Sequence, residues 1–394
     1  EIVDQSSQDG KRWYAGKKNI IQEESNNKFK NYELNFADKS VVIQCILVED
    51  SMIYIGTNKG LYSWAKNKDL TFSNITISLK NALQKKSKDD IKLNSEDIAL
   101  GIRRRVFEHC IKNNGAYLSQ ACSSAEQLAW LYNEALNFGD SILPSVPEKF
   151  KGVPNINNKS YKTGAGYNGP IGSEYDRLIF APAHYALVAY ATLIEVGRMS
   201  PDALSMFNKD GSSVEIIGAE HSPGMEMHNG TLGIGLSTAA GIAYGRKLKN
   251  EKGQTCVFMS DGELQEGQIW EALQVSVYYN LDNLWAIVDV NEQQVDGAMS
   301  DVLDIGNIHK KINSFGAKCI EIDGHDINAM RQAKNENHIG KPLIILARTS
   351  PYKGMKYLKT RFPRLHYVRF KSEEEREKMN NEISKELGIS PIKY

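Results

Sequence analysis

The second half of the chain contains short runs of consecutive apolar residues. Between two of these runs, the apolar residues instead recur at the spacing of a helix. Residues 256–259 (CVFM) and 284–288 (LWAIV) are two such runs. The segment between them has apolar residues at helical spacing, namely Ile269, Trp270, Leu273 and Val277. This order predicts a strand, a helix and a second strand in an α/β fold. Two parallel strands joined by one helix end at the same edge of their sheet.

Polar residues follow each of these two runs. Asp261 and Gly262 come directly after the first, and Asn291 follows the second 30 positions later. We therefore expect Asp261 and Asn291 side by side at the carboxyl edge, where open α/β sheets bind ligands. Carboxylate and amide oxygens suit Mg²⁺ or Ca²⁺, and Gly262 would let a phosphate approach the backbone. The alternative is that both residues are ordinary turn residues, and spacing alone does not decide.

Two helices are predicted upstream of this unit. Residues 97–110 carry Ile98, Ile102 and Val106 on one face. The consecutive arginines 103–105 spread around that helix, which favours a solvated face over phosphate contacts. A second helix is predicted from Ser124, capped by Ser123 or Ser124.

The first 80 residues have a different pattern. WYAG at residues 13–16 and IYIG at 53–56 recur 40 positions apart, which resembles β-propeller blades of four short strands. Chance similarity between two hairpins is the alternative. Polar residues 81–96 predict a linker, and residues 371–394 a C-terminal surface helix after the main domain of residues 97–370.

Composition excludes several classes of protein. The 48 basic and 48 acidic residues cancel, so no nucleic acid or anionic membrane is expected as a partner. No apolar run approaches the roughly 20 residues of a membrane span, and the N-terminus lacks a signal pattern. Five cysteines without a C-x-x-C pair indicate reduced thiols and a cytoplasmic location. The chain starts at Glu1 rather than Met, as expected of a fragment or a processed chain.

The residues of the central unit resemble the thiamine diphosphate motif of transketolases. SDGELQEGQIWEA at 260–272 and DVNEQQVDG at 289–297 are most similar to the N-terminal subunit of split, two-gene transketolases. The resemblance covers residues 97 to about 370 and implies a doubly wound, mostly parallel sheet. It implies Mg²⁺ (or Ca²⁺) ligands at Asp261, Asn291 and the main-chain oxygen of Gln293. One departure is Ser260, where the family has glycine.

Further cofactor contacts are implied by the same resemblance. Gly262 and Glu263 belong to the metal motif. Glu266 and Glu271 match two glutamates of an acidic network that links the two cofactors across the dimer. The run GTLGIG at 230–235 matches the family's G-x-L-G-x-G, so Gly230, Thr231 and Leu232 should line the aminopyrimidine or the diphosphate.

Four positions correspond to family histidines that meet the substrate or cofactor. His184 ends the strand DRLIFAPAH, where the family has S-x-G-H. His221 resembles the family's H-P histidine, although the link to Pro223-Gly224 is shorter than in the family, and His228, near the glycine run, could take its place. His366 is the candidate for the histidine that reaches the diphosphate. The fourth histidine is replaced, either by Asn113 or by Tyr117, which puts the standard sugar-phosphate substrate in question.

The cofactor-activating glutamate of transketolases lies on a separate pyrimidine-binding domain. Only about 45 residues follow the last predicted core strand, whereas such a domain needs roughly 150. The resemblance therefore implies two-carbon ketol transfer between sugar or sugar-phosphate substrates by an α₂β₂ complex with a C-terminal, pyrimidine-domain subunit. The alternatives are another thiamine diphosphate enzyme, such as a decarboxylase or E1 component, and a non-catalytic interaction protein. Residues 140–175, rich in glycine, proline and asparagine, are a candidate substrate lid, and a purely structural excursion is the alternative.

Overall fold

The computed structural model describes residues 94–394 except 154, 160 and 229, together with the backbone of eight strands between residues 2 and 74. The chain divides into two compact units, Glu1–Lys92 and Leu93–Tyr394. Most of the predicted linker, residues 81–93, lies outside the described residues.

The N-terminal unit contains two four-stranded sheets whose strands follow in chain order, β1-β2-β3-β4 and β5-β6-β7-β8. All neighbouring strands are antiparallel. The strands are β1 Ile2–Gln8, β2 Lys11–Gly16, β3 Ile20–Ser25, β4 Lys28–Glu33, β5 Ile43–Glu49, β6 Met52–Thr57, β7 Gly60–Ala65 and β8 Ser73–Asn74. Four strands per sheet is the number expected of a propeller blade, and the blade assignment stays a prediction.

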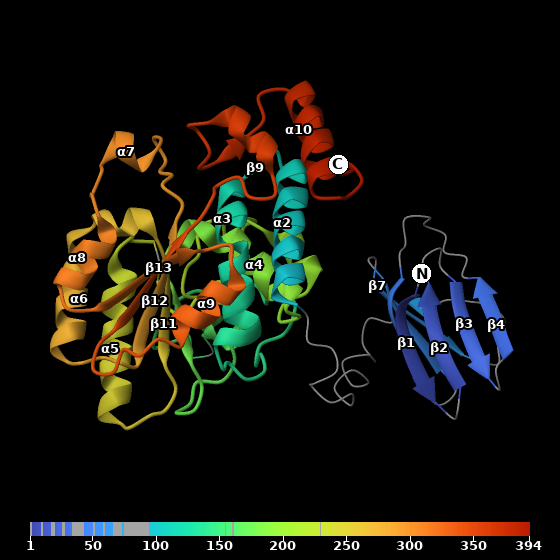
Figure 1. The fold of residues 1–394 in the computed structure, drawn as a ribbon, viewed down its shortest axis with the longest axis horizontal. Helices are drawn as coiled ribbons and strands as arrows, with labels where there is room; N and C mark the ends of the chain where they lie inside the picture. The colour runs from blue at the N-terminus through green and yellow to red at the C-terminus, as the bar shows by residue number, and fades with distance from the viewer. Residues whose placement is uncertain are drawn as a thin grey trace. The chain divides into compact units, whose positions relative to one another are not determined.

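The C-terminal unit is built on a parallel five-stranded sheet in the order β10-β11-β12-β14-β13 (Figure 1). Its strands are β10 Arg177–Phe180, β11 Thr255–Ser260, β12 Leu284–Val290, β13 Lys318–Asp323 and β14 Leu343–Arg348. Every residue of β11 and β12 is buried, which explains their uninterrupted apolar runs. The two strands pair in parallel from Thr255 opposite Leu284 to Ser260 opposite Asp289.

Helices cover both faces of this sheet. Phe258 and Ile287 belong to a core shared with α2, α3, α4, α9 and α10, whereas Val257 and Val288 belong to a core shared with α5, α6 and α8. Figure 1 shows these two helical layers on opposite sides of the strands. The helices are α2 Ser95–Lys112, α3 Leu118–Trp130, α4 Ala186–Glu195, α5 Ile234–Leu248, α6 Gly267–Tyr278, α8 Ile308–Ser314, α9 Ile327–Lys334 and α10 Glu373–Glu386. The predicted doubly wound α/β fold is confirmed.

The remaining elements are short. A two-stranded ribbon pairs β9 Gly115–Ala116 with β15 Val368–Arg369. The short helices are η1 Leu131–Ala135, η2 Gly164–Tyr167, η3 Ala183–Tyr185, η4 Pro201–Met206, η5 Asp261–Gln265, α7 Met299–Val302 and η6 Lys356–Arg361. None of the helices that the structure describes is long and apolar enough to span a membrane.

The predicted start of the second helix was wrong. α3 begins at Leu118 and is buried along its whole length, so Ser123 and Ser124 lie inside it and cap nothing. Their hydroxyls are satisfied elsewhere, because Ser124 donates to the Gln120 carbonyl at 2.6 Å and Ser123 to the Asp289 carboxylate at 2.6 Å. Serine therefore fits a buried helix here without an unpaired hydroxyl.

The expectation of a solvated arginine face on α2 was also wrong for Arg103. Its side chain is buried and donates to Glu126 at 2.5 Å and to the Cys122 carbonyl at 2.9 Å. Arg104 donates to the carbonyl of Leu387, just after α10, at 2.9 Å. Consecutive arginines thus tie α2 to different neighbours.

The buried helix α3 predicts a large stability effect. Leu128 is 0% exposed, so Leu128→Ala should lower the free energy of unfolding by about 2–5 kcal/mol, through lost burial and the cavity left behind. Urea unfolding followed by helical ellipticity measures this. Leu248 ends α5 at 66% exposure, and Leu248→Ala should change the same quantity by less than about 0.5 kcal/mol. Equal losses of unfolding free energy for the two substitutions would contradict the burial of Leu128 in the core.

Candidate cofactor site

The ends of β11 and β12 bring Asp261 and Asn291 to one place. Asp261 opens η5 directly after β11 and is 1% exposed. Its Oδ2 accepts a hydrogen bond from the main-chain N–H of Glu292, the residue after Asn291, at 2.7 Å. The two strand ends are therefore joined by a direct bond at the carboxyl edge.

Asp261 lacks a compensating positive charge. Burial raises the pKa of its carboxyl to about 8, and the nearby Asp289 raises it further against the hydrogen bonds from the main chain. No lysine, arginine or histidine forms an ion pair with Asp261 within the part of the chain that the structure describes. A buried carboxylate in this position would gain from a bound cation.

The segment after Asn291 turns sharply. Glu292 has a positive φ of 57°, and the Gln293 N–H donates to Asn291 Oδ1 at 2.9 Å. The Gln293 side-chain oxygen is buried without a hydrogen-bond partner. The turn thus places the Gln293 main chain next to the Asn291 amide oxygen.

Glu263 joins two loops of the site. It is 0% exposed; its Oε2 accepts from the Ser260 N–H at 2.9 Å, and its Oε1 from the Gly233 N–H at 3.2 Å. Burial raises the pKa of this carboxyl to about 7. Gly233 caps α5 with a φ of 88°, and a Cβ there would meet Glu266 Cβ at 2.7 Å. Glu263 therefore holds the glycine run against the metal motif.

The predicted ligand-facing residues beside Glu263 are accessible. Gly230, Thr231 and Leu232 are exposed, and Gly262 is half-buried. A Cβ at Gly262 would meet only Gln294 Nε2, at an ordinary 3.7 Å, so the chain's own packing does not require glycine there. Glu266 is exposed as well.

Three aromatic rings gather where the β9–β15 ribbon meets the carboxyl edge. The Tyr117 ring centroid lies 5.7 Å from that of His184 and 5.4 Å from that of His366, and the two histidines are 4.9 Å apart. Burial lowers the pKa of His184 to about 3, with His366 adding to the effect, and burial also lowers the pKa of His366. Both imidazoles are therefore neutral near neutral pH.

The other predicted substrate or cofactor residues, Asn113, His221 and His228, lie outside this cluster of rings. Asn113 ends α2 and is exposed, and its amide donates to the His109 carbonyl at 2.9 Å, so Tyr117 rather than Asn113 accompanies His184. His221 stacks on Phe150 with centroids 4.0 Å apart and bonds Glu215 at 3.0 Å. His228 is exposed beside Gly230.

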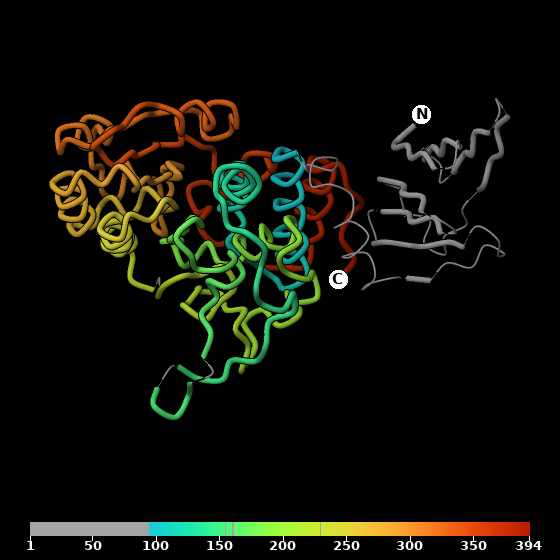
Figure 2. The backbone as a smooth tube through the Cα atoms, turned by 90° about the horizontal axis from the view of Figure 1, so that it is seen from below, coloured from blue at the N-terminus to red at the C-terminus, as the bar shows by residue number. Residues whose placement is uncertain are grey.

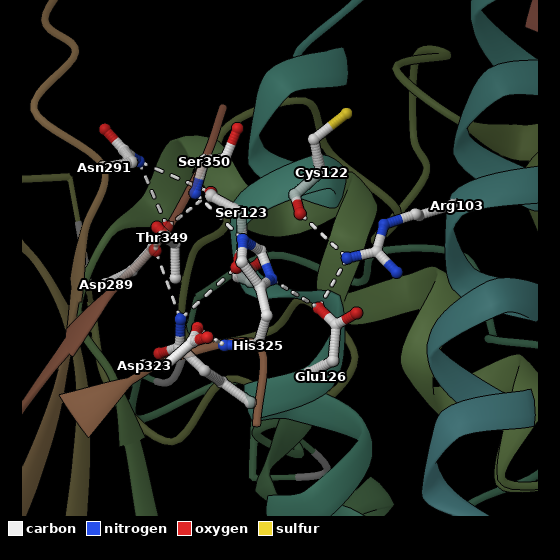
Figure 3. Close-up of polar contacts among 12 residues, drawn as sticks. Arg103, Cys122, Ser123, Glu126, Asp289, Asn291, Asp323, His325, Thr349 and Ser350 are labelled. Carbon is white, nitrogen blue, oxygen red and sulfur yellow. Dashed lines mark hydrogen bonds and ion pairs between the residues drawn. The ribbon is translucent and has the colours of Figure 1, made fainter. Parts of the chain in front are cut away.

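Asp289 is the main residue that sequence reasoning missed. Its carboxylate is 0% exposed and accepts hydrogen bonds from side chains of several elements, some of which Figure 3 draws. A signal was available in the sequence, because Asp289 falls within a strand whose other residues are apolar. An acidic residue in a strand buried on both faces requires dedicated partners.

A second buried network supports the neighbouring strand ends (Figure 3). Arg103 and His325 both bond Glu126 Oε2, at 2.5 Å and 3.0 Å. The Ser350 N–H donates to His325 Nε2 at 2.9 Å, so Nδ1 of this ring carries the proton that Glu126 accepts. Figure 3 shows His325 between Glu126 and the chain after β14. The ring thus orders the segment that follows the strand.

Comparison with known proteins identifies the family. Residues 165–359 match the family model described as "Transketolase, thiamine diphosphate binding domain". An uncharacterized transketolase family protein of Sinorhizobium fredii is 37% identical over 279 residues, which are 69% of this chain and 90% of that protein.

The chain belongs to the transketolase family.

Relatives within this family agree with the predicted subunit type. An apulose-4-phosphate transketolase subunit from Actinobacillus succinogenes is 33% identical over 50% of this chain and 72% of its own length. A 6-deoxy-6-sulfo-D-fructose transketolase subunit from a Clostridium species is 32% identical over 47% and 68%. The assignment to the N-terminal, diphosphate-binding subunit of split transketolases is confirmed.

Solved transketolases share the fold. The enzyme of Campylobacter jejuni superposes with a TM-score of 0.59 at 21% identity, covering 75% of this chain and 43% of that one. The enzyme of Leishmania mexicana gives 0.59 at 22% identity, covering 77% and 42%. The chain therefore spans about two fifths of these transketolases.

The Arg103–Glu126–His325 network predicts a pH-dependent stability effect. Burial opposes the charge of Glu126, but hydrogen bonds from His325 and Arg103 lower its pKa from 4.5 to about 2. Glu126→Gln leaves Arg103 buried without a counter-charge and should cost about 3–5 kcal/mol of unfolding free energy at neutral pH. Because the folded-state pKa is depressed, this difference should be complete above pH 4.5 and shrink towards pH 2.

Urea unfolding at several pH values measures the effect. The matched control is Glu108→Gln, which breaks only the exposed pair with Lys112 on α2 and should cost no more than about 0.5 kcal/mol. A pH-independent difference for Glu126→Gln would rule out the charged network.

Proposed function

We propose that this chain holds the diphosphate of thiamine diphosphate through a divalent cation at the carboxyl edge, and transfers two-carbon ketol units between sugar-type substrates together with a second chain. The observation that carries the proposal is the bonded pair of strand ends, with buried Asp261 bound to the N–H that follows Asn291. The matching family domain supports the cofactor. When bound, the cofactor supplies a carbanion that can attack the substrate carbonyl.

The residues present fit a Mg²⁺ or Ca²⁺ ion. Asp261 offers a buried carboxylate whose charge lacks a cationic partner among the described residues, and the Asn291 amide oxygen and Gln293 carbonyl oxygen are further hard ligands. Three protein ligands leave octahedral positions for diphosphate oxygens and water. Gly262 and the exposed residues 230–232 would face the cofactor.

His184, His366 and Tyr117 would form the substrate side of the site. Their rings lie within 6 Å of one another, and both histidines are held neutral by burial. Neutral imidazoles can accept or donate a hydrogen bond to a substrate hydroxyl or carbonyl. We expect Tyr117 to contribute its hydroxyl where most transketolases use a histidine.

The proposed partner is a pyrimidine-domain chain in an α₂β₂ complex. Relatives whose names describe them as transketolase subunits support a second chain. Glu266 and Glu271 are exposed, and a shallow groove between α5 and α6 carries the exposed side chains of Val275 and Tyr279 beside Glu271. An apolar groove next to acidic residues suits an interface between subunits.

The insert is proposed to contribute to substrate choice. Figure 2 shows residues 155–159 extending away from the rest of their unit. Phe150, Tyr161, Lys149 and Lys162 line a pocket with His221 at the base of this segment. A basic and aromatic pocket suits an anionic sugar derivative, such as a sugar phosphate. The four described cysteines are buried free thiols, which supports a cytoplasmic location.

Replacing the proposed metal ligand should abolish cofactor binding. Asp261→Ala removes the only charged protein ligand, so Mg²⁺-dependent binding of thiamine diphosphate should fall below detection by calorimetry. Asp202→Ala, at an exposed position in η4, is the matched control and should bind as the native chain does. Unchanged affinity for Asp261→Ala would refute the site.

Activity should require the second chain. Ketol transfer between sugars, measured as product formed over time, should be undetectable for this chain alone. It should appear on mixing with a pyrimidine-domain chain, such as the product of a neighbouring gene. Because the activating glutamate is expected on that chain, replacing it there should remove the activity again. Full activity of the present chain alone would contradict the split-enzyme proposal.

A further inference from the structure

The Asp289 carboxylate is completely enclosed by hydrogen-bond donors. It is 0% exposed and no basic side chain pairs with it in the described part of the chain. Oδ2 accepts from Ser123 Oγ at 2.6 Å, Tyr185 Oη at 2.8 Å and Asn291 Nδ2 at 3.1 Å, and Oδ1 from Thr349 Oγ1 at 2.6 Å and Gln127 Nε2 at 3.1 Å. A carboxylate has about four lone-pair positions, so this one has none left for a metal.

These contacts fix the orientation of the Asn291 amide. Carboxylate oxygens accept hydrogen bonds, and the side of Asn291 that faces Asp289 is its NH₂ group. The same nitrogen lies 3.0 Å from Tyr185 Oη and 3.4 Å from Ser123 Oγ, whose protons are already directed at Asp289. Oδ1 consequently points the other way, where it accepts the Gln293 N–H at 2.9 Å.

The orientation matters because only one end of an amide can bind a cation. The oxygen carries lone pairs and negative partial charge, whereas the NH₂ group would oppose a metal ion. Asn291 without a fixed partner could present either end. Partners that orient a metal ligand commonly affect metal affinity about 10–100-fold.

We propose that Asp289 is a positioning residue that turns the Asn291 amide oxygen towards the metal while binding no metal itself. This inference rests on the proposed cofactor site and adds the residue that sets its geometry. Asp289 and Asp261 thereby have different roles, although both are buried carboxylates at adjacent strand ends. Asp289 is saturated by the chain, and Asp261 is left for the cation.

The test measures Mg²⁺ affinity and not turnover. The full chain is titrated with Mg²⁺ by calorimetry in the presence of thiamine diphosphate, and the heat of Mg²⁺ binding to the free cofactor is subtracted. Asp289→Asn replaces one of the two acceptor oxygens by an NH₂ donor, so the Asn291 amide is no longer held in one orientation and the Kd for Mg²⁺ should rise about 10–100-fold. Asp323→Asn makes the same change at the exposed end of β13 and should leave the Kd unchanged. If the native chain binds no Mg²⁺, the proposed cofactor site fails; if it binds and Asp289→Asn binds equally well, only the present inference fails.

A charge swap separates positioning from simple structural support. A carboxylate at 291 has two equivalent oxygens and needs no orientation, but beside Asp289 it suffers like-charge repulsion. The double variant Asp289→Asn with Asn291→Asp should therefore bind Mg²⁺ more tightly than either single variant. It also keeps one charge and one amide in the pair, so it serves as the decisive variant if Asp289→Asn alone does not fold. Because the added carboxylate strengthens cation binding by its charge in either case, the deciding comparison is with Asn291→Asp. If Asp289 acted only as a structural support, the double variant would bind Mg²⁺ no more tightly than Asn291→Asp, and that result would overturn the proposal.

Discussion

A buried carboxylate without a cationic partner must be surrounded by hydrogen-bond donors, or it loses its charge. The carboxyl edge of this sheet contains two buried carboxyl groups, Asp289 and Asp261, and their surroundings differ. Asp289 receives five side-chain donors, whereas burial and Asp289 itself raise the pKa of Asp261 to about 8. The concentration of side-chain donors on Asp289 leaves Asp261 with hydrogen bonds from the main chain, and the proposed site for a cation and a diphosphate depends on that contrast.

The donors can converge only because the sheet is parallel. β11 and β12 end in register, with Ser260 opposite Asp289, and β14 pairs with β12 on the other side. Each βα connection thus delivers a polar residue to one edge while the apolar residues of the same strands fill two cores. Helix α3 contributes Ser123 and Gln127 from above the strand ends, which accounts for a fully buried helix that nevertheless carries hydroxyl and amide side chains.

Local patterns in the sequence were sufficient to predict the sheet and the proximity of Asp261 to Asn291. The two residues follow the ends of two parallel strands that a single crossover helix connects. Contacts between residues far apart in the sequence could not be predicted from these local patterns. Asp289 meets Ser123 and Tyr185 across 166 and 104 positions. The two-residue pairing of β9 with β15 brings His366 to Tyr117, and a ribbon that short leaves no periodicity to detect. The start of α3 was misjudged because Ser123 and Ser124, residues typical of helix caps, here donate to a buried acid and to a carbonyl of the same helix.

The acidic groups of the C-terminal unit fall into a buried set with partners and an exposed set. Inside the unit, Asp289, Glu126 and Glu263 all have their partners within this chain. Glu266 and Glu271, in contrast, are exposed, and Glu271 lines the groove between α5 and α6. Acidic groups in water cost little, so the exposure of these two residues is compatible with the folded unit. The buried acids of the proposed diphosphate site are thus organised by this chain's own residues, and the exposed acids remain available to the proposed second chain.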